Sequence, residues 1–521
     1  MLIEIHMIQN YSPANLNRDD LGAPKTCLFG GVTRARISSQ AIKRSIRKPA
    51  NPDNVHSRQP GLLAQAMGPY VGTRTKYFPW LVGKELKNSA IPEKDWPGIV
   101  QAAQVIASAK AEDSARSKKS SSSDNRPKTP QLIHIGPHHA KAFVDTLTRL
   151  ASEQPEQYRF YLNPQVIFRE CLRSVLLDSD LPEKTQEEAV NCAWFLATSR
   201  REQLFSGVDT SDSTISWSES DLGIFQAEAI ALRLSEINQS DPDPLKDLLR
   251  KPKKEERSQA GAEIKEPPGM KKFRDALSQV DRYDAVDIAL FGRMTTSEAF
   301  ADVEAAMQVA HAVSTHAVVN EVDYFTAVDD LGATGGGAGH VDEAMFNSAC
   351  FYKYFSLDWD QLLYNLRPSA DSEPTDFPRQ LAAAALGHFL RAAALSSPSG
   401  KQNSHAAHNP PHAILVEVKS DKIPISYANA FADPVQPSRE HSLVTLSVER
   451  LARYADHVSS GYGIASTRLW FCLDQQNPWS DVGSAESLAS LEELIARTVK
   501  AGTGLEWNEI RNIAQQAQQE G

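Results

Sequence analysis

The side chains with the clearest chemical potential lie close together near the N-terminus. Residues 18–48 contain eight basic residues and only two acids, a balance of +6, whereas the whole chain of 521 residues carries a formal charge of -10. Binding of a phosphate backbone depends on local clusters of Lys and Arg more than on net charge. This segment is therefore a candidate polyanion site. Its basic residues are Arg18, Lys25, Arg34, Arg36, Lys43, Arg44, Arg47 and Lys48.

The second half of this segment predicts a short helix over residues 38–48, which Pro49 helps to end. Ser38 or Ser39 would be its N-cap, because a serine oxygen can accept a hydrogen bond from an N–H group of the first turn. The start of a helix has free N–H groups and a positive partial charge. It is therefore a ready site for an anion.

Residue spacing divides this helix into two faces. Lys43 and Arg47 are four residues apart and Gln40 lies one turn earlier, so all three share a face. Ile42 and Ile46 are also four residues apart and predict a buried stripe. One face would pack on the protein while the other presents two cations and an amide.

Gly30-Gly31 lies just upstream of the helix and would allow a ligand to approach the backbone closely. An ordinary solvent-exposed basic helix could show the same serine cap and the same pair of cations. The combination of cap, diglycine, Arg18 and Lys25 within one short window favours a binding site, to which Arg44 would also contribute.

Hydrophobic patterning predicts an α+β fold. The expected strands are 2–8, 286–290, 349–356, 413–419 and 467–473. The expected helices are 38–48, a segment with Val303, Ala306, Met307, Ala310 and Val313 on one face, 377–395, 442–457 and the C-terminal 485–519. Residues 321–346 are expected to form a loop excursion with a glycine-rich tip.

Residues 49–285 interrupt this pattern with a largely helical region. Two stretches within it, 112–130 and 250–272, have the composition of disordered segments. Because strands on both sides must share one sheet, the region is predicted to be an insertion. The expected organisation is a first sheet portion at 1–48, an inserted lobe at 49–285 and a second sheet portion at 286–521, in an RRM-like (ferredoxin-like) arrangement.

The overall composition suits an ordinary globular protein, with 41% hydrophobic residues and no apolar run long enough to span a bilayer. The N-terminus lacks the basic start and apolar block of a secretory signal. The five cysteines are scattered and never spaced as CxxC, which favours a reducing compartment over a disulfide framework. A cytoplasmic location is expected.

Histidines and paired acids are the other candidates for a metal or catalytic site. Two histidine groups have no acids or cysteines at ligand spacing, so no metal or cofactor is expected; they are His134, His138 and His139, and His405, His408 and His412. Two acid pairs, Asp19-Asp20 and Asp329-Asp330, could bind Mg²⁺ and support a metal-dependent ribonuclease. Capping or salt-bridging roles beside Arg18 and Arg293 are the favoured explanation for these acids.

A set of ordered motifs resembles the CasC-type (Cse family) backbone subunit of the type I-E CRISPR Cascade complex, in the RAMP superfamily. The motifs span most of the predicted α+β body and occur in the family's order. They are Leu16-Asn17-Arg18-Asp19-Asp20, Phe29-Gly30-Gly31, Arg36 to Lys43-Arg44, Asp287 to Met294, Ala310-His311-Ala312-Val313, Thr315-His316, Phe325 to Leu331, and Ala428-Asn429-Ala430-Phe431.

The resemblance implies a CRISPR RNA-binding, non-catalytic subunit of a ribonucleoprotein in antiviral defence. Identical copies would stack head to tail along the CRISPR RNA, beside other Cascade subunits, and would meet target DNA through the complex. The fold would be an RRM-like palm with an enlarged helical finger domain and a thumb hairpin at 318–346. By family correspondence, the residues facing the RNA backbone would be Arg18, Lys25, Ser38, Gln40, Lys43 and Arg47.

The resemblance also implies apolar contacts that displace a base at intervals along the RNA, made by Met294, Tyr324, Phe325 and Val341. Tyr324 and Phe325 could instead anchor their loop on the palm. The chain departs from the family in the length of the 49–285 lobe and at Asn403, where a basic loop residue is expected. The alternatives are the ribonuclease named above and a general single-strand RNA-binding protein outside any CRISPR complex.

Overall fold

The computed structural model describes residues 1–48, 61–107, 126–129, 131–153, 155, 158, 172–173, 175–177, 179–197, 204, 224–240, 243–249, 285–295, 300–327, 340–367, 376–474, 477–479 and 485–520. The chain forms two compact units. The first comprises Met1–Thr73, Arg282–Arg293 and Val303–Gly521, and the second comprises Arg74–Asp281 and Met294–Asp302. The sequence predicted an inserted region at 49–285. Helix α2 (Leu62–Met67) lies inside that range but belongs to the first unit.

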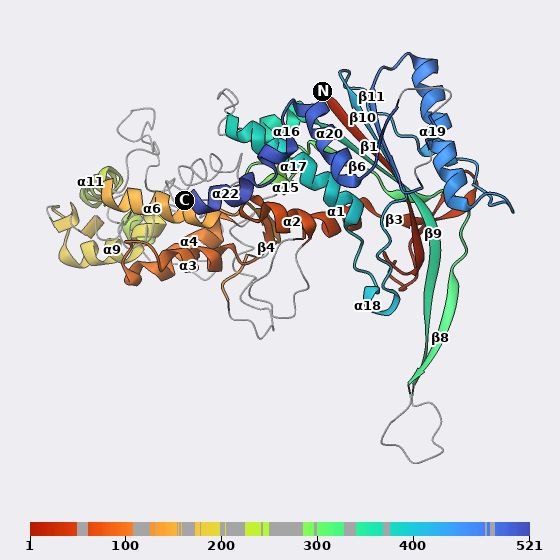
Figure 1. The fold of residues 1–521 in the computed structure, drawn as a ribbon. Coiled ribbons are helices and arrows are strands. Elements are labelled where there is room, and N and C mark those ends of the chain that lie inside the picture. Colours follow the sequence, from red (N-terminus) through yellow and green to blue (C-terminus); the bar gives the residue numbers. More distant parts are fainter. Residues whose placement is uncertain are drawn as a thin grey trace. The chain divides into compact units, whose positions relative to one another are not determined.

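A large mixed sheet organises the first unit (Figure 1). Its order is β12-β11-β10-β1-β9-β7-β3-β2, and β6 and β8 also pair with β9. The strands are β1 (Leu2–Ala14), β2 (Thr26–Phe29), β3 (Val32–Ile37), β6 (Met307–Val309), β7 (Ala312–Ser314), β8 (Glu321–Ala327), β9 (His340–Asp358), β10 (Ala413–Lys419), β11 (Thr467–Cys472) and β12 (Ala485–Leu488). All the pairings are antiparallel except that of β11 with β12.

β1 lies between β10 and β9, and its residues 2–9 are all buried. Ile5 pairs with Val416 on one side and Phe355 on the other. Successive side chains of a strand point to opposite faces. Continuous burial therefore means that both faces of the sheet are covered.

Helices from the second half of the chain cover these two faces. One face packs on α17 (Asp376–Leu395) and α20 (Leu491–Thr503), and the other on α19 (Leu443–Tyr462) (Figure 1). The alanine-rich α17 allows close packing: a Cβ at Gly387 would lie 2.3 Å from the Trp507 ring. The remaining helices of this unit are α1 (Ser39–Arg47), α15 (Val286–Phe291), α16 (Trp359–Asn365), α18 (Gln402–His405), α21 (Trp507–Ile510) and α22 (Ile513–Glu520), with 3-10 turns η1 (Gly68–Tyr70) and η4 (Ala428–Phe431).

Most of the strong periodic segments were predicted correctly. The helices at 38–48, 377–395 and 442–457 correspond to α1, α17 and α19, and the strands at 413–419 and 467–473 to β10 and β11. The strands predicted at 2–8 and 349–356 are both longer in the structure, because β1 and β9 pair with each other over most of their length.

Two predicted elements were wrong. Residues 286–290 form helix α15 instead of a strand, and the supposed helix through 303–313 forms β6 and β7. The C-terminal region is helical in α20, α21 and α22 as predicted, but it begins with the strand β12. The two ends of the predicted loop at 321–346 pair with each other as strands of β8 and β9. A short apolar run such as 286–291 fits either helix or strand by periodicity alone. For β6 and β7, pairing with β9 decides the conformation.

The second unit is mainly helical and has two apolar clusters. Its described elements are β4 (Thr73–Thr75), α3 (Phe78–Leu86), η2 (Glu93–Asp95), α4 (Trp96–Ile106), β5 (Ile133–Ile135), α6 (His139–Glu153), α9 (Glu183–Ala197), α11 (Ile224–Ser240) and α12 (Asp243–Leu249). Of the stretches predicted to be disordered, 250–272 and all of 112–130 except 126–129 lie outside the described residues.

The structure is thus a mixed α+β fold with a large sheet, and the RRM-like palm, finger and thumb remain predictions. Among the helices that the structure describes, none is both long enough and apolar enough to cross a bilayer.

Candidate nucleic-acid interface

The loop between β1 and β2 holds Arg18 on the surface. Asp19 Oδ1 accepts hydrogen bonds from the backbone N–H groups of Leu21 and Ala23, each at 2.9 Å. The buried Asn15 amide donates to the carbonyls of Gly22 and Met345 at 2.9 and 2.8 Å. The loop is therefore internally braced and anchored on β9, and the Arg18 side chain is exposed.

Gly30 and Gly31 form the two-residue turn of the β2–β3 hairpin. Their φ angles of 60° and 77° are the left-handed values that such a turn needs and that glycine adopts without strain. A Cβ at Gly30 would lie 1.7 Å from the Ala432 carbonyl oxygen, whereas Gly31 faces open space. The close backbone approach predicted for a ligand is thus made at Gly30 by the protein's own chain.

Arg34 stabilises the fold from inside and is not available on the surface. It is fully buried on β3, where burial lowers the pKa of its guanidinium. Its guanidinium donates to four backbone carbonyls: those of Phe29, Ser314, Phe431 and Ala432, at 2.8–3.1 Å. One of the eight basic residues in the N-terminal window is therefore occupied inside the fold.

The start of α1 is built as the sequence predicts. Ser38 is the N-cap, and its Oγ accepts from the Ala41 N–H at 3.3 Å. The Ser38 N–H donates to Asn17 Oδ1 at 2.9 Å, which ties the helix start to the Arg18 loop. Ile42 and Ile46 are buried, as expected for the packing stripe.

The polar face of α1 is not uniform. Arg47 Nη1 lies 3.5 Å from a carboxylate oxygen of Asp287, which is completely buried. Lys43 Nζ lies 5.7 Å from the centre of the Phe291 ring, and burial lowers its pKa. Gln40 and Arg44 are exposed. Within the last turn, Arg47 thus neutralises an internal acid, whereas Arg44, like Gln40 near the helix start, faces solvent.

His311 lies against the start of α1. Its Nδ1 accepts a hydrogen bond from the Ser39 N–H at 3.2 Å. Its pKa is lowered, first by burial and then by the positive charges of Arg36 and Lys25. Because an acceptor Nδ1 carries no proton, the geometry agrees with a neutral ring in a positive environment. Arg36, Lys25 and the helix start therefore form one positive region.

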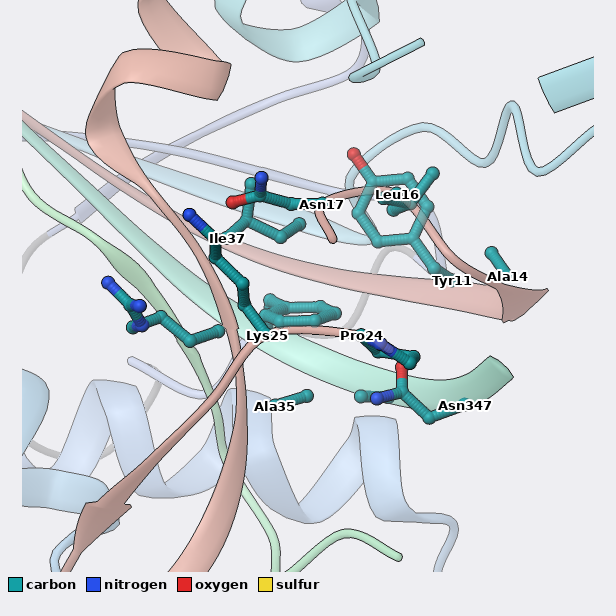
Figure 2. Close-up of a pocket in the computed structure, with 12 residues that line it drawn as sticks. Tyr11, Ala14, Leu16, Asn17, Pro24, Lys25, Ala35, Ile37 and Asn347 are labelled. Carbon is teal, nitrogen blue, oxygen red and sulfur yellow. The ribbon is translucent and has the colours of Figure 1, made fainter. Parts of the chain in front are cut away.

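Two adjoining hollows lie beside this region. The smaller has a volume of about 20 Å³, room for about one water molecule. Figure 2 shows Lys25 extending along it towards the Asn17 amide, with Tyr11 and Asn347 contributing from β1 and β9. The larger is an open hollow of about 490 Å³, and its lining residues are Leu16, Asn17, Arg18, Asp19, Asp20, Gly22 and Gly400.

The β8–β9 hairpin extends well beyond the sheet (Figure 1). Tyr324 and Phe325 are 70% and 44% exposed, so neither is buried as an anchor would be. As consecutive strand residues they lie on opposite faces of the ribbon, with Glu343 and Asp342 as their cross-strand partners. Val341 pairs with Thr326 in the same ribbon.

The hairpin also has a charge of its own. Its exposed acids are Glu321, Asp323, Asp342 and Glu343, and residues 321–327 and 340–346 include neither Lys nor Arg. An acidic ribbon repels a phosphate backbone. Any contact with a nucleic acid must therefore rest on the exposed apolar and aromatic side chains.

The other predicted site residues come from other parts of the chain or have a structural role. Met294 is 94% exposed and begins the short stretch assigned to the second unit. Asp329 and Asp330 lie outside the described residues, while Asp19 braces its own loop. Sequence reasoning missed the roles of Asn17 and His311, which act through hydrogen bonds to the backbone of Ser38 and Ser39.

Comparison with known proteins gives a family and a fold. A family model described as CT1975-like protein matches residues 3–195 and 169–497. A chain of a solved structure named "CRISPR RNA-guided surveillance complex, pre-nicking" matches with a TM-score of 0.57 and 23% identity, covering 96% of this chain and 100% of that one. At this identity the match shows a shared fold. A chain of a second, "CRISPR RNA-guided surveillance complex", has a TM-score of only 0.44 and 19% identity, covering 96% and 99%. No curated protein matches this chain.

Proposed function

The chain belongs to the CT1975-like protein family of Cas proteins, and from this premise we propose that it is a CRISPR RNA-binding backbone subunit of a Cascade-type surveillance complex. In the proposal, several copies stack along the guide RNA and support its pairing with target DNA. The ordered motifs favour the type I-E, CasC-type subunit. The named partners are CRISPR RNA, identical copies and other Cascade subunits.

The observation that carries this proposal is the positive region at the start of α1. Arg18 is held on a braced loop, and Lys25 and Arg36 act together on His311. The helix start adds a positive partial charge, although its Ser39 and Ala41 N–H groups already donate to His311 and Ser38. Cations and backbone N–H groups are the donors that contact phosphates, and such contacts position a nucleic acid without reading its sequence.

A backbone subunit has to hold any guide sequence. In RNA-guided systems base pairing selects the target, so the protein gains nothing from reading base edges of the guide. The hydrogen bonds that anchor Asn15 and Asn17 keep the Arg18 loop and α1 in a fixed relation. A rigid set of cations at fixed spacing suits a regular RNA backbone.

We propose binding rather than catalysis. Asp19 accepts two backbone hydrogen bonds that shape its loop, which accounts for this acid without a metal. The ribonuclease alternative would need Asp19 or Asp20 to hold Mg²⁺. An assembled complex that cleaves target RNA, and loses cleavage on Asp20→Asn, would contradict the proposal.

The binding test uses Arg18→Ala with Lys25→Ala, compared with a charge-matched control of Arg439→Ala with Arg453→Ala, two exposed arginines elsewhere in the first unit. Fluorescence anisotropy with two unrelated single-stranded RNAs would be measured over a salt series. We expect weaker binding of both RNAs and a salt-dependence slope about 1.4 shallower, since each phosphate contact contributes about 0.7 for a single strand.

The control variant should bind like the unchanged protein. A loss confined to one of the two RNA sequences would contradict phosphate contact. Equal losses in the test and control variants would mean that overall charge, not this region, attracts the RNA.

A further inference from the structure

Three potential metal ligands meet at one end of the sheet in the first unit. A ring nitrogen of His412, the Cys472 sulfur and a carboxylate oxygen of Asp474 all lie within 4.8 Å of one another. His412 immediately precedes β10, and Cys472 is the last residue of β11. The histidine is some sixty positions from the other two in the chain, so sequence spacing gave no sign of the group.

Backbone pairing holds these residues in place. The His412 N–H donates to the Ile8 carbonyl on β1 at 2.8 Å, and the Leu473 N–H donates to the His412 carbonyl at 2.9 Å. Ala413 and Cys472 are register partners in the β10–β11 ladder. The three side chains therefore project from fixed strand ends, as a preorganised site requires.

His412 and Asp474 already form a close pair. Nε2 of His412 lies 2.5 Å from Asp474 Oδ1, an ion pair when the ring is protonated, and this nitrogen is closed off from solvent. The described residues give the nitrogen no other partner. A metal ion can replace the proton that such a pair shares, once the two side chains move apart enough to coordinate it.

The ligand types select the metal. A thiolate, an imidazole and a carboxylate form a set that suits Zn²⁺, whereas Mg²⁺ and Ca²⁺ prefer oxygen ligands alone. We propose that His412, Cys472 and Asp474 bind a Zn²⁺ ion. Cys472 releases its thiol proton to solvent on binding, and the thiolate and carboxylate then balance the charge of the ion. A fourth position is left for water.

The other histidine–carboxylate group of the first unit is a contrast. Glu4, His6 and Glu417 are also close enough to share a metal. However, Lys419 forms an ion pair with Glu4, and Arg468 Nε lies 2.9 Å from Glu417 Oε1. Cations of the protein already occupy that cluster, whereas the described residues place no such ion pair on Asp474 beyond His412.

Zinc at this position would join β11 and the residue after it to the start of β10. These strands lie on the opposite side of β1 from β3 and β2 in the strand order. The proposed metal site is therefore separate from the proposed RNA contact, and an experiment that disproves one proposal leaves the other standing.

The test uses the full chain, stripped with a chelator and titrated with Zn²⁺ and with Co²⁺. One equivalent of Co²⁺ should give the visible bands of a tetrahedral site and a thiolate-to-metal charge-transfer band. His412→Gln, Cys472→Ser and Asp474→Asn should each weaken Zn²⁺ binding at least about 100-fold, because even outer partners of zinc ligands cost about 10–100-fold. His408→Gln, a neighbouring histidine outside the group, should bind like the unchanged protein.

The proposal is overturned if the unchanged protein binds no stoichiometric Zn²⁺, or if the charge-transfer band survives Cys472→Ser. Circular dichroism of each metal-free variant checks its fold. If Cys472→Ser fails to fold, Asp474→Asn decides, since Asp474 is exposed and its replacement removes a ligand without opening the core. Unchanged affinity in that variant would also overturn the three-ligand site.

Discussion

The basic segment of residues 18–48 and the β8–β9 hairpin were both predicted to contact RNA, but they are built in opposite ways. The basic segment includes β2 and β3 of the sheet, and its cations are sorted by burial: Arg34 is inside and Arg18 is outside. The hairpin extends from the sheet and carries exposed acids beside exposed aromatic residues. Two regions of one proposed interface can therefore bind RNA by different interactions: electrostatic attraction in the basic segment and stacking in the hairpin.

The comparison also shows that charge counted from the sequence is not charge available to a ligand. Arg34 donates to four carbonyls and Arg47 pairs with the buried Asp287. The cations that remain in contact with solvent include those near the start of α1 and Arg44 in its last turn. Fewer cations are therefore available to RNA than the net charge of +6 in residues 18–48 suggested.

The largest expected effect is on stability, and it distinguishes the buried cation of the basic segment from an exposed one. Arg34→Ala should lower the free energy of unfolding by at least about 3 kcal/mol, because several buried carbonyls lose a charged donor and each unsatisfied acceptor costs about 1–3 kcal/mol. Arg44→Ala, at an exposed position, should change it by less than about 0.5 kcal/mol. Urea unfolding of both variants measures this, and similar stabilities would contradict the structural role of Arg34.

The next effect concerns the two faces of the hairpin. If one face stacks on bases, either Tyr324→Ala or Phe325→Ala should weaken RNA binding by about 1–3 kcal/mol, the contribution of one stacked base. The other variant should have little effect, since the two rings lie on opposite faces. RNA affinity and its salt dependence would be measured for both. Equal losses, or a shallower salt slope, would argue against stacking from one face.

A smaller effect is expected from the hairpin acids. Asp323→Asn with Asp342→Asn should strengthen RNA binding about twofold at low salt, because exposed charges interact by less than about 1 kcal/mol, and the gain should vanish at high salt as the charges are screened. Anisotropy titrations at two salt concentrations test this. An unchanged affinity at low salt would mean that the hairpin does not approach the phosphate backbone.

The smallest effect is a pH dependence at His311. Its pKa in the folded protein lies below the ordinary value of 6.5, so the unfolded state binds more protons as pH falls through that value. The stability due to the neutral ring is therefore present above pH 6.5 and is lost as pH falls through the folded pKa. Bound phosphate should raise the pKa of His311, and RNA binding should tighten slightly as pH falls from about 7 to 6.

NMR titration of the His311 ring with and without RNA measures this change. His388 serves as the internal control, because burial lowers its pKa on α17 and its nearby charges are Arg391 and Glu492 rather than the basic segment. An RNA-induced rise at His388 equal to that at His311 would show a general effect of charge. No rise at His311 would place the phosphate elsewhere.

The sequence by itself determined the elements whose signals are local. A serine cap at the start of α1, the buried Ile42 and Ile46 of that helix, and the long α17 all follow from spacing within one helix. Local spacing failed at 286–291 and at β6 and β7, where a short apolar pattern fits two conformations and only pairing or packing chooses between them.

Only the tertiary structure decided which charges are usable and which distant residues meet. It places Arg34 inside the sheet beside Ser314 and Phe431, closes Gly30 against Ala432, and brings His311 to the start of α1. It also joins His412 to Cys472 and Asp474 across the β10–β11 ladder. The physical reason is the same in each case. Spacing along the chain determines which nearby residues share a face of a helix or strand. Strand pairing and burial determine which residues far apart in the chain come together in one site.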